Sequence, residues 1–132
     1  MEPKRIFDIL DYYISNYPGK QDALANKQKG EWTIYSIHDY YDYARHLALG
    51  LWALGIKKGD KIASVSENRP EWNFFDMAMM QIGVIHVPIY PTISSEEYEY
   101  ILKHSEAKYL LTGSASLYKK VKPIADKIKT VK

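Results

Sequence analysis

Three polar loops hold the side chains of this chain that could bind a charged ligand. They span 66–69 (Ser-Glu-Asn-Arg), 89–94 (Ile-Tyr-Pro-Thr-Ile-Ser) and 112–115 (Thr-Gly-Ser-Ala), and each follows a short apolar segment and precedes a helical pattern. Their hydroxyl groups, amide, guanidinium and helix N-termini suit an anion or a polar ligand. The alternative, which the sequence favours within this chain, is that these residues only cap helices and shape turns.

Other catalytic patterns are missing from the sequence. Gly55 and Gly59 precede a strand instead of following one, so they indicate a helix stop and not a phosphate-binding loop. There is no Gly-x-Ser-x-Gly pattern and no cysteine, and no serine has a histidine partner that the spacing favours. The four histidines lack the spacing that lets two imidazoles share a metal from one helix turn. We therefore predict no catalytic residue and no metal site in this chain.

Alternating strands and helices would position the three loops. The pattern predicts strands over 61–66, 84–88 and 108–112, followed by helices over 70–81, 95–103 and 116–128. This alternation is typical of a parallel sheet, which binds ligands beyond the carboxyl ends of its strands. We therefore expect an α/β fold with a three-layer, doubly wound, mostly parallel sheet of the flavodoxin-like type, and all three loops at one edge.

An N-terminal helix and a small β-hairpin precede these repeats. Apolar residues follow the helical period from Ile6 to Ile14, and segments 22–26 and 31–35 flank the turn-rich residues 27–30. A long helix begins at Ser36, with Asp39 at the capping position, and Gly55 can end it in the left-handed conformation. Residues 130–132 resemble the start of a further strand, as in a piece of a longer protein.

Composition limits the class of protein and its partners. Hydrophobic residues make up 46% and aromatic residues 14%, which excludes a disordered chain, and no apolar run reaches the roughly 20 residues that span a bilayer. The 132 residues suffice for a single domain over 1–132. A net charge of +2 gives no reason to expect nucleic acid as a partner. The lysines between 119 and 132 fit a solvated helix face better than an anion or membrane patch.

Several blocks of sequence resemble the opening segment of AMP-forming long-chain fatty-acid CoA ligases, which are acyl-CoA synthetases of the adenylate-forming superfamily. They lie at 31–35 (EWTIY), 55–61 (GIKKGDK), 67–72 (ENRPEW), 83–92 (GVIHVPIYPT) and 101–108 (ILKHSEAK). They follow the order of the family and span nearly the whole chain. The resemblance implies that this chain is an N-terminal subdomain of such an enzyme.

The resemblance also implies a reaction. ATP and Mg²⁺ activate a fatty acid to an acyl-adenylate with release of pyrophosphate, and the acyl group then passes to the thiol of CoA. The family's phosphate loop, nucleotide contacts and catalytic lysine all follow the segment seen here. We therefore predict that this chain alone is inactive and binds no cofactor tightly.

The family also implies a position for CoA. Its nucleotide part approaches the loop that corresponds to Tyr90, Pro91 and Thr92. Lys119 and Lys120 would contact its phosphates only if the following helix presents them to the same edge. The other expected partners are the remaining subdomains of the polypeptide and a fatty acid, and self-association of the fragment is plausible.

The sequence also favours a location for the protein and leaves one alternative function open. The lack of cysteine and of an apolar signal core favours a cytoplasmic location, with a peripheral place at the membrane left open. The alternative function is a stand-alone flavodoxin-like binding or interaction module. A gene that continues past Lys132 into a glycine-rich phosphate loop would favour the ligase, whereas a stop codon would favour the module.

Overall fold

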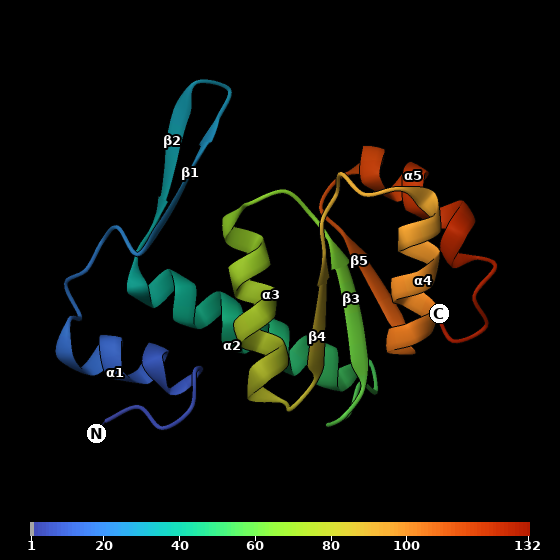
Figure 1. The fold of residues 1–132 in the computed structure, drawn as a ribbon. Coiled ribbons are helices and arrows are strands. Elements are labelled where there is room, and N and C mark those ends of the chain that lie inside the picture. Colours follow the sequence, from blue (N-terminus) through green and yellow to red (C-terminus); the bar gives the residue numbers. More distant parts are fainter. Residues whose placement is uncertain (1) are drawn as a thin grey trace. The chain divides into compact units, whose positions relative to one another are not determined.

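A computed structural model describes residues 2–132, and its central feature is a parallel sheet of three strands, β3 (Lys61–Val65), β4 (Ile85–Ile89) and β5 (Tyr109–Thr112). The strand order is β4-β3-β5, so the chain steps outward from β3 to β4 and then returns across β3 to β5 (Figure 1). This reversal defines a doubly wound sheet. The predicted α/β class and parallel sheet are confirmed, with β4 one residue later than expected.

The described chain divides into two compact units. One comprises the residues up to 56 together with 69–82, and the other comprises 57–68 together with 83–132. The three-stranded sheet belongs entirely to the second unit. The expectation of a single domain over 1–132 stays a prediction.

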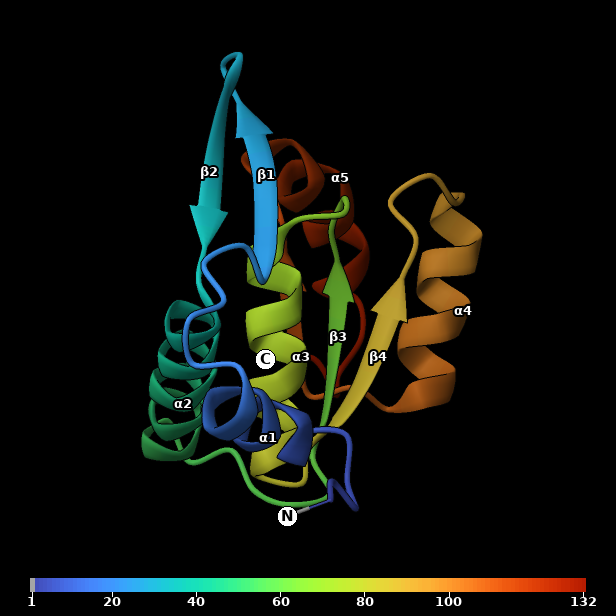
Figure 2. The same cartoon turned by 90° about the vertical axis from the view of Figure 1, so that its left-hand side faces the viewer.

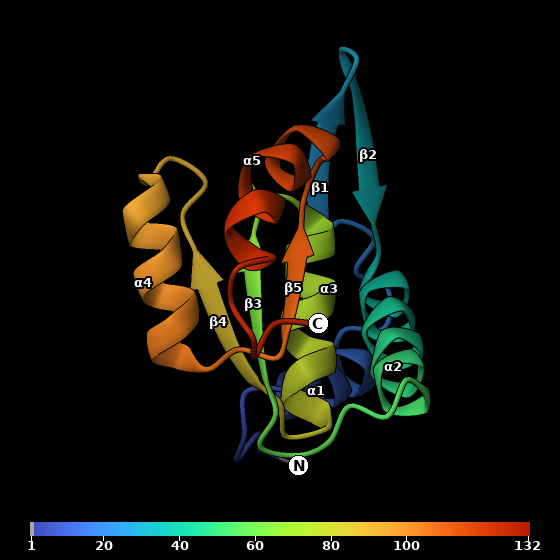
Figure 3. The same ribbon diagram turned by 90° about the vertical axis from the view of Figure 1, so that its right-hand side faces the viewer.

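Helices α4 (Ser95–Ser105) and α5 (Ala115–Ala125) pack on one face of the three-stranded sheet (Figure 3). Alternate residues of β3, Ala63 and Val65, point into this interface, as the two-residue period of a strand requires. The buried side chains that the helices contribute are Tyr98, Leu102, Leu117, Val121, Ile124 and Ala125. This core fixes the two helices that border the loops after the strands.

The end of α5 differs from the prediction. The helix stops at Ala125, three residues before the expected end at Ile128, and Pro123 lies in its last turn. Proline has no amide hydrogen to donate to the carbonyl four residues earlier, which weakens the last turn of this helix. No strand forms over 130–132, although Lys132 N donates a hydrogen bond to Lys108 O beside the start of β5.

The first unit contains α1 (Asp8–Asn16), the hairpin strands β1 (Leu24–Gln28) and β2 (Glu31–Tyr35), α2 (Ile37–Ala53) and α3 (Pro70–Gln81) (Figure 2). Leu10 of α1 packs with Ile37 and Ala44 of α2 in a buried cluster. The rings of Tyr43 and Phe74 stack with their centroids 4.8 Å apart. These contacts join α1, α2 and α3 around a core of their own.

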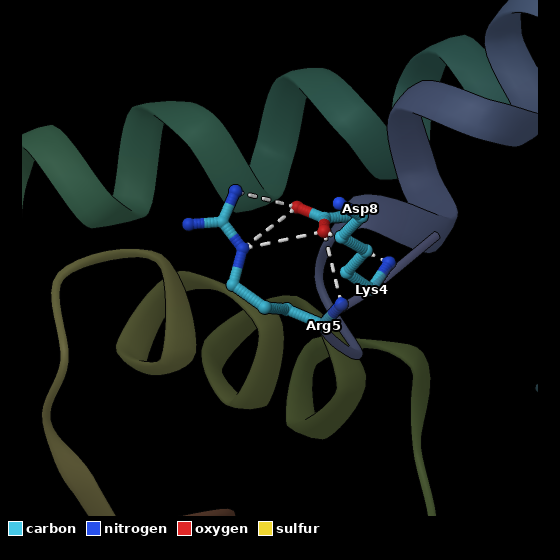
Figure 4. A network of polar contacts seen from close by, with 3 residues as sticks. All are labelled: Lys4, Arg5 and Asp8. Atoms are coloured by element: carbon cyan, nitrogen blue, oxygen red, sulfur yellow. Dashed lines mark hydrogen bonds and ion pairs between the residues drawn. The ribbon is translucent and has the colours of Figure 1, made fainter. Parts of the chain in front are cut away.

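Helix α1 begins at Asp8 and not at Ile6, because the residues before it form a turn around the Asp8 carboxylate. The amides of Lys4 and Arg5 donate to Asp8 Oδ2 over 3.2 and 2.9 Å, and Nη2 of Arg5 donates to Oδ1 over 2.8 Å (Figure 4). The Arg5 side chain is the main reason that the pKa of Asp8 is lowered. The apolar period therefore starts at Ile6, before the regular helix begins at Asp8.

The hairpin is shifted relative to the prediction. Strand β1 spans Leu24–Gln28 instead of 22–26, and Gln28 pairs with Glu31 across a turn of only two residues. Lys29 and Gly30 both have positive φ, of 50° and 90°, which is the pattern of a type I′ turn. Polar residues 27 and 28 therefore belong to the strand and not to the loop.

Local signals at the helix ends are confirmed. Ser36 and Asp39 form a capping box at the start of α2, Pro70 occupies the first turn of α3, and Gly55 takes a φ of 85° where α2 ends. These features depend on a few neighbouring residues, which is why the sequence reveals them.

Candidate functional site

The loops that follow the three strands lie at one edge of the second unit. Val65 pairs with Ile89 of β4 and with Thr112 of β5, so the three strands end level with one another. Their arrowheads point to the same edge in Figure 3. We call residues 66–68, 90–94 and 113–114 the carboxyl edge. The expected gathering of the loops is confirmed for these residues.

The serines of the carboxyl edge act as caps and turn formers. Ser94 Oγ accepts from Glu97 N over 3.2 Å, and Ser94 N donates to Glu97 Oε2 over 2.8 Å. Ser114 Oγ accepts from Leu117 N over 3.2 Å, and Ser66 Oγ donates to Glu67 O over 2.8 Å. The backbone amide of Ser94 is the largest cause of the lowered pKa of Glu97. Ser94 and Ser114 thus cap helices and Ser66 forms a turn contact, as the alternative interpretation predicts, and whether these serines bind a ligand stays a prediction.

Arg69, the guanidinium of the first loop, belongs to the first unit. Its Nε donates to Oε2 of Glu71 over 2.8 Å and its Nη2 donates to Oε1 over 2.9 Å. This fork-shaped pair is the first cause of the lowered pKa of Glu71. Arg69 therefore already binds a carboxylate of its own helix.

Side chains of helices α4 and α5 donate hydrogen bonds to the loop of Tyr90, Pro91 and Thr92. Tyr98 of α4 donates its hydroxyl hydrogen to Tyr90 O over 3.1 Å. Lys120 Nζ of α5 donates to Pro91 O over 3.0 Å and to Ile93 O over 3.1 Å. The Tyr90 side chain is 79% exposed, and Thr92 is exposed as well. The loop thus binds α4 and α5 through its backbone carbonyls and presents the side chains of Tyr90 and Thr92 to solvent.

Lys120 and Tyr98 also contact each other. The ammonium of Lys120 lies 5.0 Å from the centre of the Tyr98 ring, and the Tyr98 side chain is fully buried. Burial raises the pKa of Tyr98, which keeps its hydroxyl protonated as a donor. Helix α5 therefore presents Lys120 to the carboxyl edge, as the CoA hypothesis requires, but the ammonium binds carbonyl groups.

Sequence reasoning missed this role because the helical period of α5 places its lysines on the outer side. Lys119 fits that expectation, since it is exposed and its side chain has no partner within residues 2–132. Tyr98 carried a weak signal, because a large aromatic residue four positions after the Ser94 cap faces back toward the preceding loop. No local pattern indicates that Lys120 would bend toward Pro91, 29 residues earlier.

The structure also pairs a serine with a histidine, which the sequence spacing had not favoured. Ser64 Oγ of β3 lies 2.7 Å from Nε2 of His86 on β4. Ser64 is only 6% exposed, so no substrate can reach its hydroxyl in this conformation. The parallel register, which aligns Ile62 with His86, creates this pair. We interpret it as a structural hydrogen bond inside the sheet.

Residues 2–132 contain neither a candidate metal site nor a candidate membrane-spanning helix. In that range no three histidine, aspartate or glutamate side chains lie close enough together to hold a metal ion. Over the same residues, no helix combines the length and apolar character needed to cross a membrane.

Sequence comparisons identify relatives along most of the chain. A family model described as AMP-binding enzyme matches residues 11–132. Fatty acyl-CoA synthetase A of Dictyostelium discoideum is 33% identical over 96% of this chain and 20% of its own length. A long-chain-fatty-acid CoA ligase of Mycobacterium bovis, FadD15, is 37% identical over 66% of this chain and 14% of its own length. The chain thus spans about a fifth or less of these curated relatives.

Solved structures share the fold. The N-terminal domain of FACL13 from Mycobacterium tuberculosis matches 98% of this chain with a TM-score of 0.83 and 25% identity, and the chain covers 33% of it. A fatty acyl CoA synthetase from Mycobacterium tuberculosis matches 96% of this chain with a TM-score of 0.81 and 25% identity, and the chain covers 25% of it. Both comparisons include the two units described above.

Proposed function

Because this chain belongs to the AMP-binding enzyme family, we propose that it forms the N-terminal part of a long-chain fatty-acid CoA ligase. The observation that carries the proposal is the family match over residues 11–132, together with 33% identity to a fatty acyl-CoA synthetase over 96% of this chain. The fold supports it as well, since a domain of a FACL13 protein has the same arrangement of elements.

The proposed reaction has two steps. The carboxylate oxygen of the fatty acid attacks the α-phosphorus of ATP and the bond to pyrophosphate breaks, which gives the acyl-adenylate and free pyrophosphate. The sulfur of CoA then attacks the acyl carbon, its proton is lost, and AMP leaves. The first step needs positive groups and a metal directed at the developing charge on phosphorus.

The charged groups at the loops of this chain do not supply that stabilisation. Lys120 donates to Pro91 O and Ile93 O, and Arg69 pairs with Glu71. Both cations are therefore committed to contacts within the chain. We propose that residues 1–132 act as a scaffold, and that the groups that bind ATP and Mg²⁺ lie elsewhere in the polypeptide.

We further propose that the loop of Tyr90, Pro91 and Thr92 faces the nucleotide part of CoA. Two observations support this: the loop lies at the carboxyl edge of a parallel sheet, where such folds bind ligands, and its side chains are exposed. The Tyr90 ring offers an aromatic face on which a purine can stack. The Thr92 hydroxyl can donate to a ribose or phosphate oxygen.

The exposed apolar side chains of the hairpin suit the remaining subdomains of the same polypeptide as partners. Trp32 and Ile34 of β2 are 64% and 56% exposed and point to the same face of the strand. Exposed apolar surface tends to be covered by association. Without those subdomains the same surface favours self-association of the 132-residue chain, which sedimentation velocity at several concentrations would measure.

Two assays on two proteins test the proposed function. The longest protein that the gene encodes should form acyl-CoA from a long-chain fatty acid, ATP-Mg²⁺ and CoA, and should exchange labelled pyrophosphate into ATP when the fatty acid is present. The 132-residue chain should do neither. A gene that ends at Lys132, or a longer product without either activity, would contradict the ligase. Fatty-acid-dependent exchange by the short chain would contradict the scaffold role.

A further inference from the structure

The backbone carbonyls of the 90–93 loop depend on side chains for their hydrogen bonds. Strand β4 ends at Ile89, so the ladder of the sheet offers these carbonyls no partners. Tyr90 O accepts from the hydroxyl of Tyr98, and Pro91 O and Ile93 O accept from the ammonium of Lys120. A single charged group thus satisfies the carbonyls on both sides of Thr92. Such charge-assisted hydrogen bonds are stronger than those between neutral groups.

Lys120 lies beside two residues of the core. Its ammonium lies over the ring of Tyr98, and that ring is completely buried between the sheet and its helices. Helix α5 is anchored one residue further on by Val121, which is also fully buried. The Lys120 side chain is exposed, and its ammonium binds two carbonyls of the loop while it lies over the ring of a buried residue, so Lys120 connects the loop to both α4 and α5.

This arrangement has a consequence for ligand binding. Three backbone carbonyls of the loop bind side chains of α4 and α5. The exposed face of the loop therefore consists of the Tyr90 ring and the Thr92 side chain. A loop that already holds its binding conformation loses less conformational entropy when a ligand arrives. We propose that Lys120 is a positioning residue that fixes the 90–92 loop in the conformation that receives the nucleotide part of CoA. This inference rests on the function proposed above.

A direct phosphate contact is the competing role for Lys120. Its two hydrogen bonds to carbonyl oxygens and its contact with the Tyr98 ring use the donors that a phosphate would need. The neighbouring Lys119 carries the same charge, is exposed and has no side-chain partner within residues 2–132. Lys119 is therefore a matched control for the loss of one positive charge from α5.

The first test measures loop motion in the 132-residue chain. Lys120→Met keeps the aliphatic stem but removes the donor, and NMR relaxation would report the backbone order parameters of Thr92 and Ile93. We expect values near 0.85 in the unmodified chain and a fall toward about 0.6 in the variant, with β3 and β4 unchanged. Lys119→Met should leave the loop rigid, and Lys120→Arg should restore it. Unchanged order parameters in Lys120→Met would overturn the inference.

The second test measures CoA use in the longest protein that the gene encodes. Lys120→Met should raise KM for CoA, and the rise is about tenfold if the competent loop falls to about one tenth of the molecules. Pyrophosphate exchange, which does not need CoA, should stay within about twofold. A mobile loop with an unchanged KM would overturn the assignment to CoA, and an equal loss of both activities would indicate a general folding defect and overturn it too.

The two failures can be told apart. If the unmodified protein makes no acyl-CoA, the proposed function is wrong whatever the relaxation data show. If Lys120→Met does not fold, Lys120→Ala replaces it, since alanine favours the helix and also removes the ammonium that binds Pro91 O and Ile93 O. Lys120→Ala should loosen Thr92 and Ile93 and raise KM for CoA, and a rigid loop with an unchanged KM would overturn the inference.

Discussion

A Cβ atom on Gly113 would lie 2.3 Å from Oγ of Ser66 and 2.8 Å from its Cβ. Gly113 N also donates to Val65 O over 2.8 Å, so the backbones of the two loops touch where β3 and β5 end side by side. The strand order reverses at this point, which is where doubly wound sheets usually open toward a ligand. Here the close approach leaves no room for a side chain on Gly113.

Gly113→Ala should therefore lower the free energy of unfolding by about 1–3 kcal/mol, the usual cost of forcing extra atoms into a packed site. Urea unfolding followed by circular dichroism would measure it. Gly50→Ala is the matched control, since Gly50 lies within α2 with nothing near its Cβ position, and it should stabilise by about 0.5–1 kcal/mol. Gly113→Ala with unchanged stability would show that the loops separate readily.

The capping box at the start of α4 predicts a pH dependence. Hydrogen bonds from Ser94 lower the pKa of Glu97 below its usual 4.5 in the folded chain. The carboxylate therefore contributes stability that is fully present above pH 4.5 and is lost as the pH falls through the lowered pKa. Glu97→Gln, which can still accept from the backbone, should melt at a lower temperature at pH 7, and the difference should shrink toward pH 3.

Glu96→Gln is the control for this prediction, because it removes one negative charge from the same turn without touching the capping box. The difference in melting temperature between Glu96→Gln and the unmodified chain should change less between pH 7 and pH 3 than the difference for Glu97→Gln. An identical pH profile for the two variants would mean that the charge near the helix start matters and the hydrogen bonds to Ser94 do not.

Replacement of Lys29 in the hairpin turn should raise the stability of the hairpin. Lys29 adopts a φ of 50° in the first central position of a type I′ turn, which asparagine tolerates better than lysine. Lys29→Asn should therefore stabilise the hairpin by a few tenths of a kcal/mol up to about 1 kcal/mol. Amide hydrogen exchange of residues 26 and 33, which face each other in the hairpin, would slow. Lys27→Asn, within β1, should not have this effect, and faster exchange in Lys29→Asn would contradict the turn assignment.

The sequence predicts the features that depend on neighbouring residues and misses those that depend on residues far apart in the chain. The cap at Ser94, the proline at the start of α3 and the left-handed Gly55 depend on residues within one turn, so the pattern reveals them. The apolar periods also reveal each strand and helix to within a few residues. Register is less visible, because a turn at 29–30 and a turn at 27–30 leave similar patterns in the sequence.

The interactions at the carboxyl edge were beyond sequence reasoning for a physical reason. The Lys120 contact with Pro91 spans 29 positions, and the periodicity of α5 describes only which side of the helix is apolar. A long, flexible side chain can leave the outer face and reach a neighbouring loop. The family resemblance indicated Tyr90, Pro91 and Thr92 as the loop of interest, but not the residues that hold it.

The pair of Ser64 and His86 gives a last prediction, because its 2.7 Å separation is that of a nucleophile and its base. Catalysis would also require that a substrate reach the hydroxyl, and Ser64 is 6% exposed in the middle of a strand. A fluorophosphonate probe should therefore leave Ser64 unmodified in the folded chain, as measured by peptide mass spectrometry against a serine hydrolase as positive control. Ser64→Ala should lower stability by about 0.5–1.5 kcal/mol, the worth of one hydrogen bond, and leave acyl-CoA formation by the longer protein unchanged. Labelling of Ser64 that disappears in His86→Gln would instead show that the strands open and that the pair is reactive.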